Sequence, residues 1–189
     1  MNTYKQYRNP STGDVLSIHY DEYPENPRTS WDNLGVVVVR DNCQYISNEG
    51  DFDLDFGSRE GDERALVNSR DIVAYLPLYV FDHSGVSFNT TGFGCPWDSG
   101  QIGWIVCTRE GLRQAGFDWK RITRKRREKI FEWLQGEVDT YSAYASGETY
   151  GFTVETAEGD QTDSCFGYYG DDGLQAIMED NPGFTEEIA

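Results

Sequence analysis

At 189 residues, the chain is long enough for one well-buried core and too short for two comfortable domains, since domains typically contain roughly 100–150 residues. Its hydrophobic content of 38% and aromatic content of 14% exclude an intrinsically disordered chain. The formal net charge of −17 comes from 33 acidic and 16 basic residues, and the basic residues comprise 12 Arg and four Lys. We therefore expect a single globular domain over residues 1–189 with a strongly acidic surface.

The acidic excess has two interpretations, and the sequence leaves both open. Self-repulsion destabilises a compact chain in dilute buffer, and molar salt relieves it by shortening the Debye length to roughly 3 Å. A chain rich in Asp and poor in Lys therefore fits a protein from a halophilic source. The second interpretation is a functional acidic surface, such as a mimic of nucleic acid.

The cysteines and the apolar runs predict a cytoplasmic protein with reduced thiols. No Cys-x-x-Cys pair is present, and no apolar segment with a basic flank opens the chain. The longest apolar runs, Gly35–Val39 and Val73–Phe81, are far shorter than the roughly 20 residues that a membrane-spanning helix needs, so no membrane association is expected. The four cysteines are Cys43, Cys95, Cys107 and Cys165.

The first 30 residues contain three prolines among polar and tyrosine side chains, and we expect them to be irregular. The β-branched run Val36–Val39 predicts the first buried strand. Phe52, Leu54 and Phe56 alternate with three aspartates, which predicts a half-buried strand with its apolar side chains on one face.

A β-hairpin is predicted over residues 71–90. Asp71–Phe81 has the strongest strand pattern, Asp82–Gly85 offers turn residues, and Val86–Thr90 returns as the second strand. Pro77 lacks an N–H group, which favours a position at a sheet edge or at a bulge. A glycine-rich loop over residues 92–100 then leads into a strand over Ile102–Cys107.

Two helices are predicted between this strand and residue 147. Thr108 can cap the start of a short helix that Gly116 ends, and Thr123 and Gly147 bound a long helix in the same way. The long helix carries an apolar stripe at spacings of three and four residues, which we expect to pack on the sheet. The residues of the stripe are Ile130, Leu134, Val138, Tyr141 and Ala145.

Strands over residues 150–156 and 162–168 flank a turn and predict a second hairpin. A short acidic helix over residues 172–179 and a frayed acidic tail over residues 180–189 complete the chain. The predicted fold class is α+β, with a mainly antiparallel sheet of about five to seven strands, one long helix packed on it and one or two short helices.

Charge is segregated along the chain. Residues 109–129 contain nine basic and three acidic residues, whereas the last 60 residues contain 14 acidic residues and no Lys or Arg. The acidic remainder opposes the approach of nucleic acid, so we expect the basic segment to pair with the protein's own acidic face. No direct nucleic-acid binding is expected.

The segment from Asp82 to Gln101 is the candidate site, because loops held by rigid strands commonly present functional groups. His83 could act as a general base for a nucleophile, with acidic partners close by in the sequence. The candidate catalytic residues are Asp82, His83, Cys95, Asp98 and Ser99. The alternative is that Asp82–Gly85 and Pro96–Gly100 are ordinary turns, the second of them with a packed Trp.

No metal or cofactor is expected. The possible zinc ligands lack the short paired spacing of zinc sites, and these ligands are His83, Cys95, Cys107 and Cys165. The aspartates at 51, 53 and 55 resemble the opening of a calcium loop, yet Phe56 stands where such a loop requires Gly. The two glycine-rich motifs that bind phosphates, G-x-x-x-x-G-K-[ST] and G-x-G-x-x-G, do not occur after any predicted strand.

Five motifs follow one another between residues 27 and 170, and these are Pro27–Gly35 (PRTSWDNLG), Asp82–Gly85 (DHSG), Cys95–Trp104 (CPWDSGQIGW), Tyr150–Phe152 (YGF) and Asp163–Gly170 (DSCFGYYG). Together they resemble a family of small uncharacterised proteins encoded by tailed phages, proviruses and integrative elements. The resemblance implies an early, non-virion accessory protein acting in the cytoplasm of a prokaryotic host, and it carries over no activity. The candidate binding residues within the motifs are Trp31, Asp32, Trp97, Asp98, Gln101 and Trp104.

Two functional hypotheses follow. In the first, a non-enzymatic accessory protein of a virus or mobile element binds a host protein, and its acidic surface competes for a basic groove that handles nucleic acid. Such a protein would be an anti-defence inhibitor or a nucleic-acid mimic. In the second, the loops from Asp82 to Gln101 form a small hydrolytic or nucleotide-modifying site.

Overall fold

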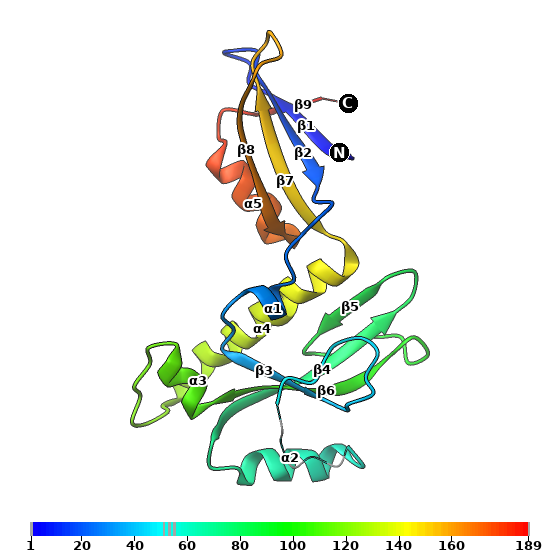
Figure 1. Cartoon of the computed structure of the whole chain (residues 1–189), viewed down its shortest axis with the longest axis vertical. Helices are drawn as coiled ribbons and strands as arrows, with labels where there is room; N and C mark the ends of the chain where they lie inside the picture. Colours follow the sequence, from blue (N-terminus) through cyan, green and yellow to red (C-terminus); the bar gives the residue numbers. More distant parts are fainter. Residues whose placement is uncertain (1, 51, 53, 55, 189) are drawn as a thin grey trace. The chain divides into compact units, whose positions relative to one another are not determined.

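The computed structural model describes residues 2–50, 52, 54 and 56–188 (Figure 1). Nine strands and five helices lie within these residues. The strands are β1 (Thr3–Arg8), β2 (Val15–Tyr20), β3 (Gly35–Val39), β4 (Ile72–Asp82), β5 (Val86–Asn89), β6 (Ser99–Thr108), β7 (Thr149–Glu155), β8 (Gln161–Tyr169) and β9 (Glu186–Ile188). The helices are α1 (Pro27–Ser30), α2 (Arg59–Asn68), α3 (Arg109–Gln114), α4 (Arg124–Ser146) and α5 (Gly170–Asp180). None of the described helices is long and apolar enough to cross a membrane.

The strands form two antiparallel sheets, of five strands in the order β8-β7-β2-β1-β9 and of four strands in the order β3-β6-β4-β5. The predicted α+β class with one long helix is confirmed, and the strands are shared between two sheets. The chain divides into two compact units, of which unit 1 comprises residues 1–30 and 143–189 and unit 2 comprises residues 31–142. One cooperative domain over residues 1–189 stays a prediction, which a single calorimetric transition would support.

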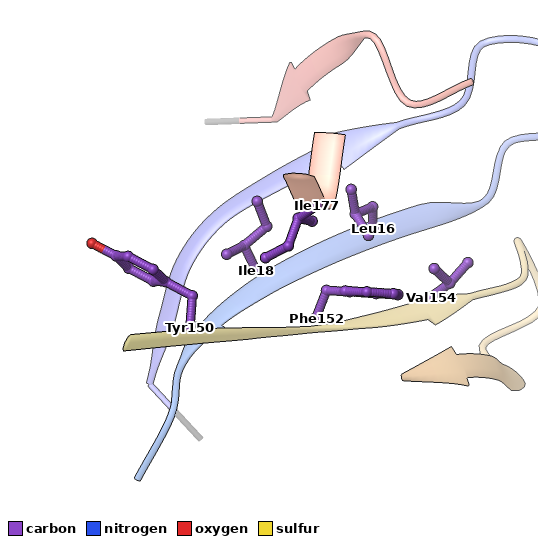
Figure 2. Packing of buried hydrophobic residues seen from close by; sticks show 6 residues of the cluster. All are labelled: Leu16, Ile18, Tyr150, Phe152, Val154 and Ile177. Atoms are coloured by element: carbon purple, nitrogen blue, oxygen red, sulfur yellow. The ribbon is translucent and has the colours of Figure 1, made fainter. Parts of the chain in front are cut away.

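Unit 1 buries apolar side chains between one face of its sheet and α5 (Figure 2). Leu16 and Ile18 alternate along β2 and lie beside Phe152 and Val154 of the neighbouring strand β7. Ile177 of α5 is fully buried in this cluster. Because successive side chains of a strand point to opposite faces, this pattern leaves a second, polar set on the other face.

The polar face of this sheet is organised around His19, which is buried. Its Nε2 lies 3.0 Å from Oγ1 of Thr153, and its Nδ1 lies 3.3 Å from Oγ1 of Thr3. Burial lowers the pKa of His19 below its ordinary value of 6.5. Beside it, the Gln6 side chain donates a hydrogen bond of 2.8 Å to the Ser17 hydroxyl. A neutral imidazole therefore fits this row of hydrogen-bonded side chains.

Two sequence predictions for unit 1 are wrong. Residues 1–30, expected to be irregular, contain β1, β2 and α1, and the tail expected to be frayed contains β9. The sequence of β1 lacks an apolar pattern, and the strand is held by its pairing with β2 and β9. The turn at Asn9–Asp14 is the signal that could have revealed the β1–β2 hairpin, since its Gly13 has a φ of +82°.

Unit 2 has a four-stranded sheet with a helix on each face (Figure 1). On one face, Leu134 of α4 lies against Gly35 of β3 and Ile105 of β6. On the other face, Leu66 of α2 packs in a cluster with Trp104 of β6. The two strands β3 and β6 are therefore apolar on both faces, in keeping with the continuous apolar run that predicted β3.

The predicted hairpin of unit 2 is confirmed as β4 and β5. Pro77 lies in a part of β4 that β5 does not reach, because β5 pairs with Tyr79–Asp82 only. The register between β4 and β6 shifts between Leu78 and Tyr79, directly after the proline. The position of Pro77 thus follows from its missing N–H group.

Both predicted helix caps are also confirmed. The Thr108 hydroxyl accepts a hydrogen bond of 2.9 Å from the Gly111 N–H and begins α3. The Thr123 hydroxyl accepts one of 3.4 Å from the Arg126 N–H at the start of α4. That helix ends before Gly147, which has a φ of +77°.

The strand predicted over residues 51–56 is not found in the described part of this segment. Residues 51, 53 and 55 lie outside the described residues. Phe52, Leu54 and Phe56 belong to no strand, but they are half-buried against the cluster of Leu66 and Trp104. Their expected partial burial is therefore confirmed, and packing against a helix and a sheet, instead of strand pairing, produces it.

Candidate functional site

The turn after β4 and the loop before β6 meet at Asp98. Its Oδ2 lies 3.4 Å from Nδ1 of His83 and 3.5 Å from Sγ of Cys95. The Asp98 carbonyl accepts a hydrogen bond of 2.8 Å from the Asp82 N–H, and the Ser99 hydroxyl donates to the Cys95 carbonyl. All five candidate catalytic residues therefore come together in unit 2.

The order of these groups differs from that of a nucleophile activated by a base. In such a site the imidazole lies between the nucleophile and the carboxylate. Here the carboxylate of Asp98 lies between the thiol of Cys95 and the imidazole of His83. The hydroxyl of Ser99 is engaged by a backbone carbonyl. The geometry is therefore that of a hydrogen-bonded loop in which the Cys95 thiol has Asp98, and not the imidazole of His83, as its partner.

The loop is open to solvent and carries an exposed tryptophan. The side chains of His83 and Asp98 are 66% and 38% exposed, and exposed ion pairs contribute only about 0–1 kcal/mol. Trp97 is 91% exposed. The neighbouring turn is tight, because Ser84 has a φ of 60° and the His83 N–H donates to the Gly85 carbonyl. A hydrogen-bonded loop thus presents one large apolar ring to solvent.

The remaining candidate binding residues have different environments. Trp31 is 41% exposed, and Asp32 beside it is exposed. Gln101 is half-buried and donates a hydrogen bond of 3.2 Å to a backbone carbonyl. Trp104 is 1% exposed and packs edge-on against Tyr75, with ring centroids 5.5 Å apart. Trp104 is therefore a core residue, and Trp97 and Trp31 are the exposed tryptophans among the candidates.

The possible zinc ligands have separate environments. Cys107 is fully buried in β6, where burial raises the pKa of its thiol to about 12 and keeps it protonated. Cys165 is exposed on β8 of unit 1, whereas His83 and Cys95 belong to the loops of unit 2. Within residues 2–50, 52, 54 and 56–188, no group of three His, Cys, Asp or Glu side chains could hold a metal ion.

A cavity of about 470 Å³ is lined in part by Gln101–Trp104 of β6, and the sequence did not predict it. Its wall includes Tyr45, whose hydroxyl donates a hydrogen bond of 3.1 Å to Oδ2 of Asp82. Arg40 and Arg59 also line it, together with the buried Asp62. The volume falls within the roughly 300–1,000 Å³ of small-molecule pockets. The guanidinium of Arg59 is paired with Glu63 at 2.9 Å, and that of Arg40 donates to the Phe56 carbonyl. The lining comes from separate chain segments, so no contiguous motif marks it.

Nine basic residues form a surface on α3, the following loop and the start of α4, here called the basic surface. Its members are Arg109, Arg113, Lys120, Arg121, Arg124, Lys125, Arg126, Arg127 and Lys129, and all but the half-buried Arg126 are exposed. Two of them form ion pairs with described carboxylates, both 2.7 Å long and within one helix, Arg113 with Glu110 and Arg124 with Glu128. Within the described residues of unit 2, no other member of the basic surface forms an ion pair with a carboxylate, and the pairing of this segment with a distant acidic face stays a prediction.

Acidic charge is concentrated in unit 1. This unit contains 15 acidic and three basic residues, a net charge of −12, whereas unit 2 contains 18 acidic and 13 basic residues, a net charge of −5. Residues 143–189 contribute eleven of these acidic residues and no basic one, and all eleven are exposed. The chain thus combines a predominantly acidic unit with a unit of mixed charge.

Comparisons with protein-family models, with curated proteins and with solved structures found no match to this chain.

Proposed function

We propose that the protein is a non-enzymatic accessory protein of a virus or mobile element, which acts in the host cytoplasm by binding a host protein. The observation that carries the proposal is the exposed, predominantly acidic surface of unit 1, with its net charge of −12. A surface of this kind complements a basic, nucleic-acid-handling groove and speeds association with it. The protein would then compete with nucleic acid for that groove, as an anti-defence inhibitor does.

Eight of the 15 acidic side chains of unit 1 are carried by helices and strands, and the other seven lie in turns and loops. On α5, Leu174, Ile177 and Met178 belong to the core side of the helix, while Glu179 and Asp180 are exposed. A fold that holds its carboxylates on helices and strands loses less entropy on binding than a flexible acidic tail does. This supports recognition by a structured surface.

The exposed Trp97 supplies a second contact of the kind that protein interfaces use. Tryptophan is enriched among residues that dominate binding energy, and alanine substitution at such positions costs at least about 2 kcal/mol. The hydrogen bonds around Cys95, Asp98 and Ser99 order the loop before any partner arrives. We therefore assign Trp97 as the apolar anchor of unit 2.

A hydrolytic or nucleotide-modifying activity of the same loops has less support. It would need His83 within reach of a nucleophile, whereas Asp98 lies beside both His83 and Cys95. If His83→Ala and Asp98→Ala abolish the biological effect while charge changes in unit 1 do not, chemistry in these loops becomes the better explanation.

The test is capture of a partner from host lysate over a series of salt concentrations. Asp160→Asn/Glu179→Gln/Asp180→Asn removes three exposed carboxylates of unit 1, and Asp71→Asn/Asp118→Asn/Glu132→Gln removes three from unit 2. We expect the first variant to lose the partner at lower salt than the wild type, and the second variant to behave like the wild type. Added DNA should displace a partner that has a nucleic-acid groove.

Two results would overturn the proposal. One is the recovery of no stoichiometric partner at any salt concentration, and the other is equal binding by the two triple variants. If the acidic residues serve salt adaptation alone, the two triple variants should bind the partner equally. Both variants should then also need less salt than the wild type to fold.

A further inference from the structure

We propose that the basic surface of unit 2 binds the phosphate backbone of nucleic acid without reading its sequence. This goes beyond the proposed function, because it concerns another surface and another class of partner. It also departs from the expectation that no nucleic acid is bound directly, which rested on repulsion by the acidic remainder and on pairing of this segment with the protein's own acidic face.

The basic surface has positive charge available to a ligand. Lys120, Arg121, Lys125 and Arg127 are exposed, and none forms an ion pair with a carboxylate in the described part of the chain. The whole segment 109–129 has nine basic residues against three acidic ones. Lys and Arg in such a cluster are the groups that neutralise phosphates, and release of the condensed counterions drives binding.

Aromatic packing makes the basic surface rigid. Phe117 and Trp119 pack on Trp133 of α4, with ring centroids 4.9 Å and 6.2 Å from that ring. The guanidinium of Arg126 lies 4.9 Å from the centroid of Trp119, and the ammonium of Lys129 lies 5.0 Å from that of Trp133. Aromatic rings thus hold two of the cations in place, which lowers the entropic cost of presenting them.

The basic surface also contains a cavity whose lining suits phosphate groups. A cavity of about 290 Å³ is lined by three cationic side chains, Arg109, Arg113 and Lys120, beside Phe117 and Trp119. Arg113 forms an ion pair with Glu110, and Asp118 also lines the cavity. Because three cationic side chains line the cavity with one carboxylate, its lining carries a net positive charge. Guanidinium groups match phosphate oxygens in geometry, whereas the rings are already stacked on one another. Contacts to phosphates are therefore favoured over stacking on bases.

The net charge of −17 limits the affinity but does not prevent contact. At physiological ionic strength the Debye length is about 8 Å, so charges beyond that distance are largely screened, whereas bound phosphates lie within hydrogen-bond reach of the cations. Nucleic-acid binding driven by a few cations is weak and steeply dependent on salt.

The experiment measures fluorescence anisotropy of a labelled mixed-sequence DNA duplex, and of its single strand, at several salt concentrations. Arg121→Gln/Lys125→Gln/Arg127→Gln removes three cations of the basic surface, and Lys5→Gln/Arg8→Gln/Arg64→Gln removes three cations elsewhere at the same net charge. For four phosphate contacts, the slope of log K against log salt is about −3.6 on the duplex and about −2.8 on the single strand. We expect the first variant to reduce the duplex slope by about 2.7 and the second to leave it unchanged.

The proposal is overturned if the wild type binds neither DNA at low salt, or if the two triple variants bind alike. It is also overturned if poly-glutamate competes as well as DNA at equal charge, since the surface would then accept an acidic protein as readily. Circular dichroism of each variant checks that its fold is retained. Because unit 1 plays no part in this binding, the carboxylate variants of unit 1 should bind DNA at least as well as the wild type.

Discussion

Replacement of Gly103 by alanine tests the strand packing of unit 2 at its closest point. Gly103 is buried on β6, where it pairs with Val39 of β3 on one side and with Leu78 of β4 on the other. A Cβ added at Gly103 would overlap the carbonyl oxygen of Val38 and lie 2.7 Å from Cγ1 of Val39. Because a backbone oxygen in a paired strand cannot rotate away, β3 must move against β6.

Overpacking of this kind costs about 1–3 kcal/mol, and the clash with backbone places Gly103→Ala near the upper value. For a chain of this size, about 3 kcal/mol lowers the melting temperature by roughly 6–12 °C. Gly100→Ala is the matched control, because Gly100 lies on the same strand and a Cβ there has no atom within 4 Å. It should leave the free energy of unfolding unchanged or raise it by up to about 1 kcal/mol.

Urea unfolding followed by circular dichroism gives the difference between the two variants directly. If Gly103→Ala proves as stable as Gly100→Ala, the close approach of β3 and β6 at this point is wrong. A lower midpoint with an unchanged dependence on urea concentration would support it.

Three further outcomes are expected. Gly136→Ala, in the interior of α4 with open space around it, should raise the free energy of unfolding by about 1 kcal/mol, and an unchanged urea midpoint would count against a well-formed helix at that position. Thiol titration of the folded protein should modify the exposed Cys165 rapidly and leave the buried Cys107, with its pKa of about 12, unreacted until unfolding, so equal rates would contradict the burial of β6. His19 has a folded pKa below 6.5, so the unfolded chain binds its proton more readily. Its contribution to stability is therefore complete above pH 6.5 and is lost as the pH falls through the folded pKa. An NMR titration of His19 that gives a pKa at or above 6.5 would refute this.

Local chemistry made much of unit 2 predictable. The caps at Thr108 and Thr123 use interactions within a few residues, and the apolar stripe of α4 has the helical period, so both signals are complete in the sequence. Pro77 likewise carries its constraint in its own ring. Where the deciding interaction was local, the prediction and the structure agree.

The division into two sheets could not be predicted in the same way. β2 pairs with β7 across a separation of more than 120 residues, and the alternation within each strand does not specify its partner. β1 is polar, and its strand character depends on the neighbours that it acquires. Pairing over such distances is a tertiary property, so propensity alone missed β1, β2 and β9.

The candidate site was located correctly as a cluster but not in its internal order. That Asp82, His83 and Asp98 come together follows from the pairing of β4 with β6, which places Phe81 at the end of one strand opposite Ser99 at the start of the other. Which group stands between which others depends on loop geometry, and no residue type encodes it. Trp104 is buried and Trp97 is exposed, and this difference likewise depends on which part of the sheet α2 covers.

The interruption of unit 1 by unit 2 has a consequence for synthesis on the ribosome. Strand β2 emerges early, but its partner β7 lies beyond the whole of unit 2. At translation rates of about 5–20 residues per second, β2 waits roughly 6–25 s with its hydrogen-bonding edge and apolar face uncovered. Unit 2 can complete its own sheet during that interval, so the nascent chain needs protection for its first hairpin until β7 arrives.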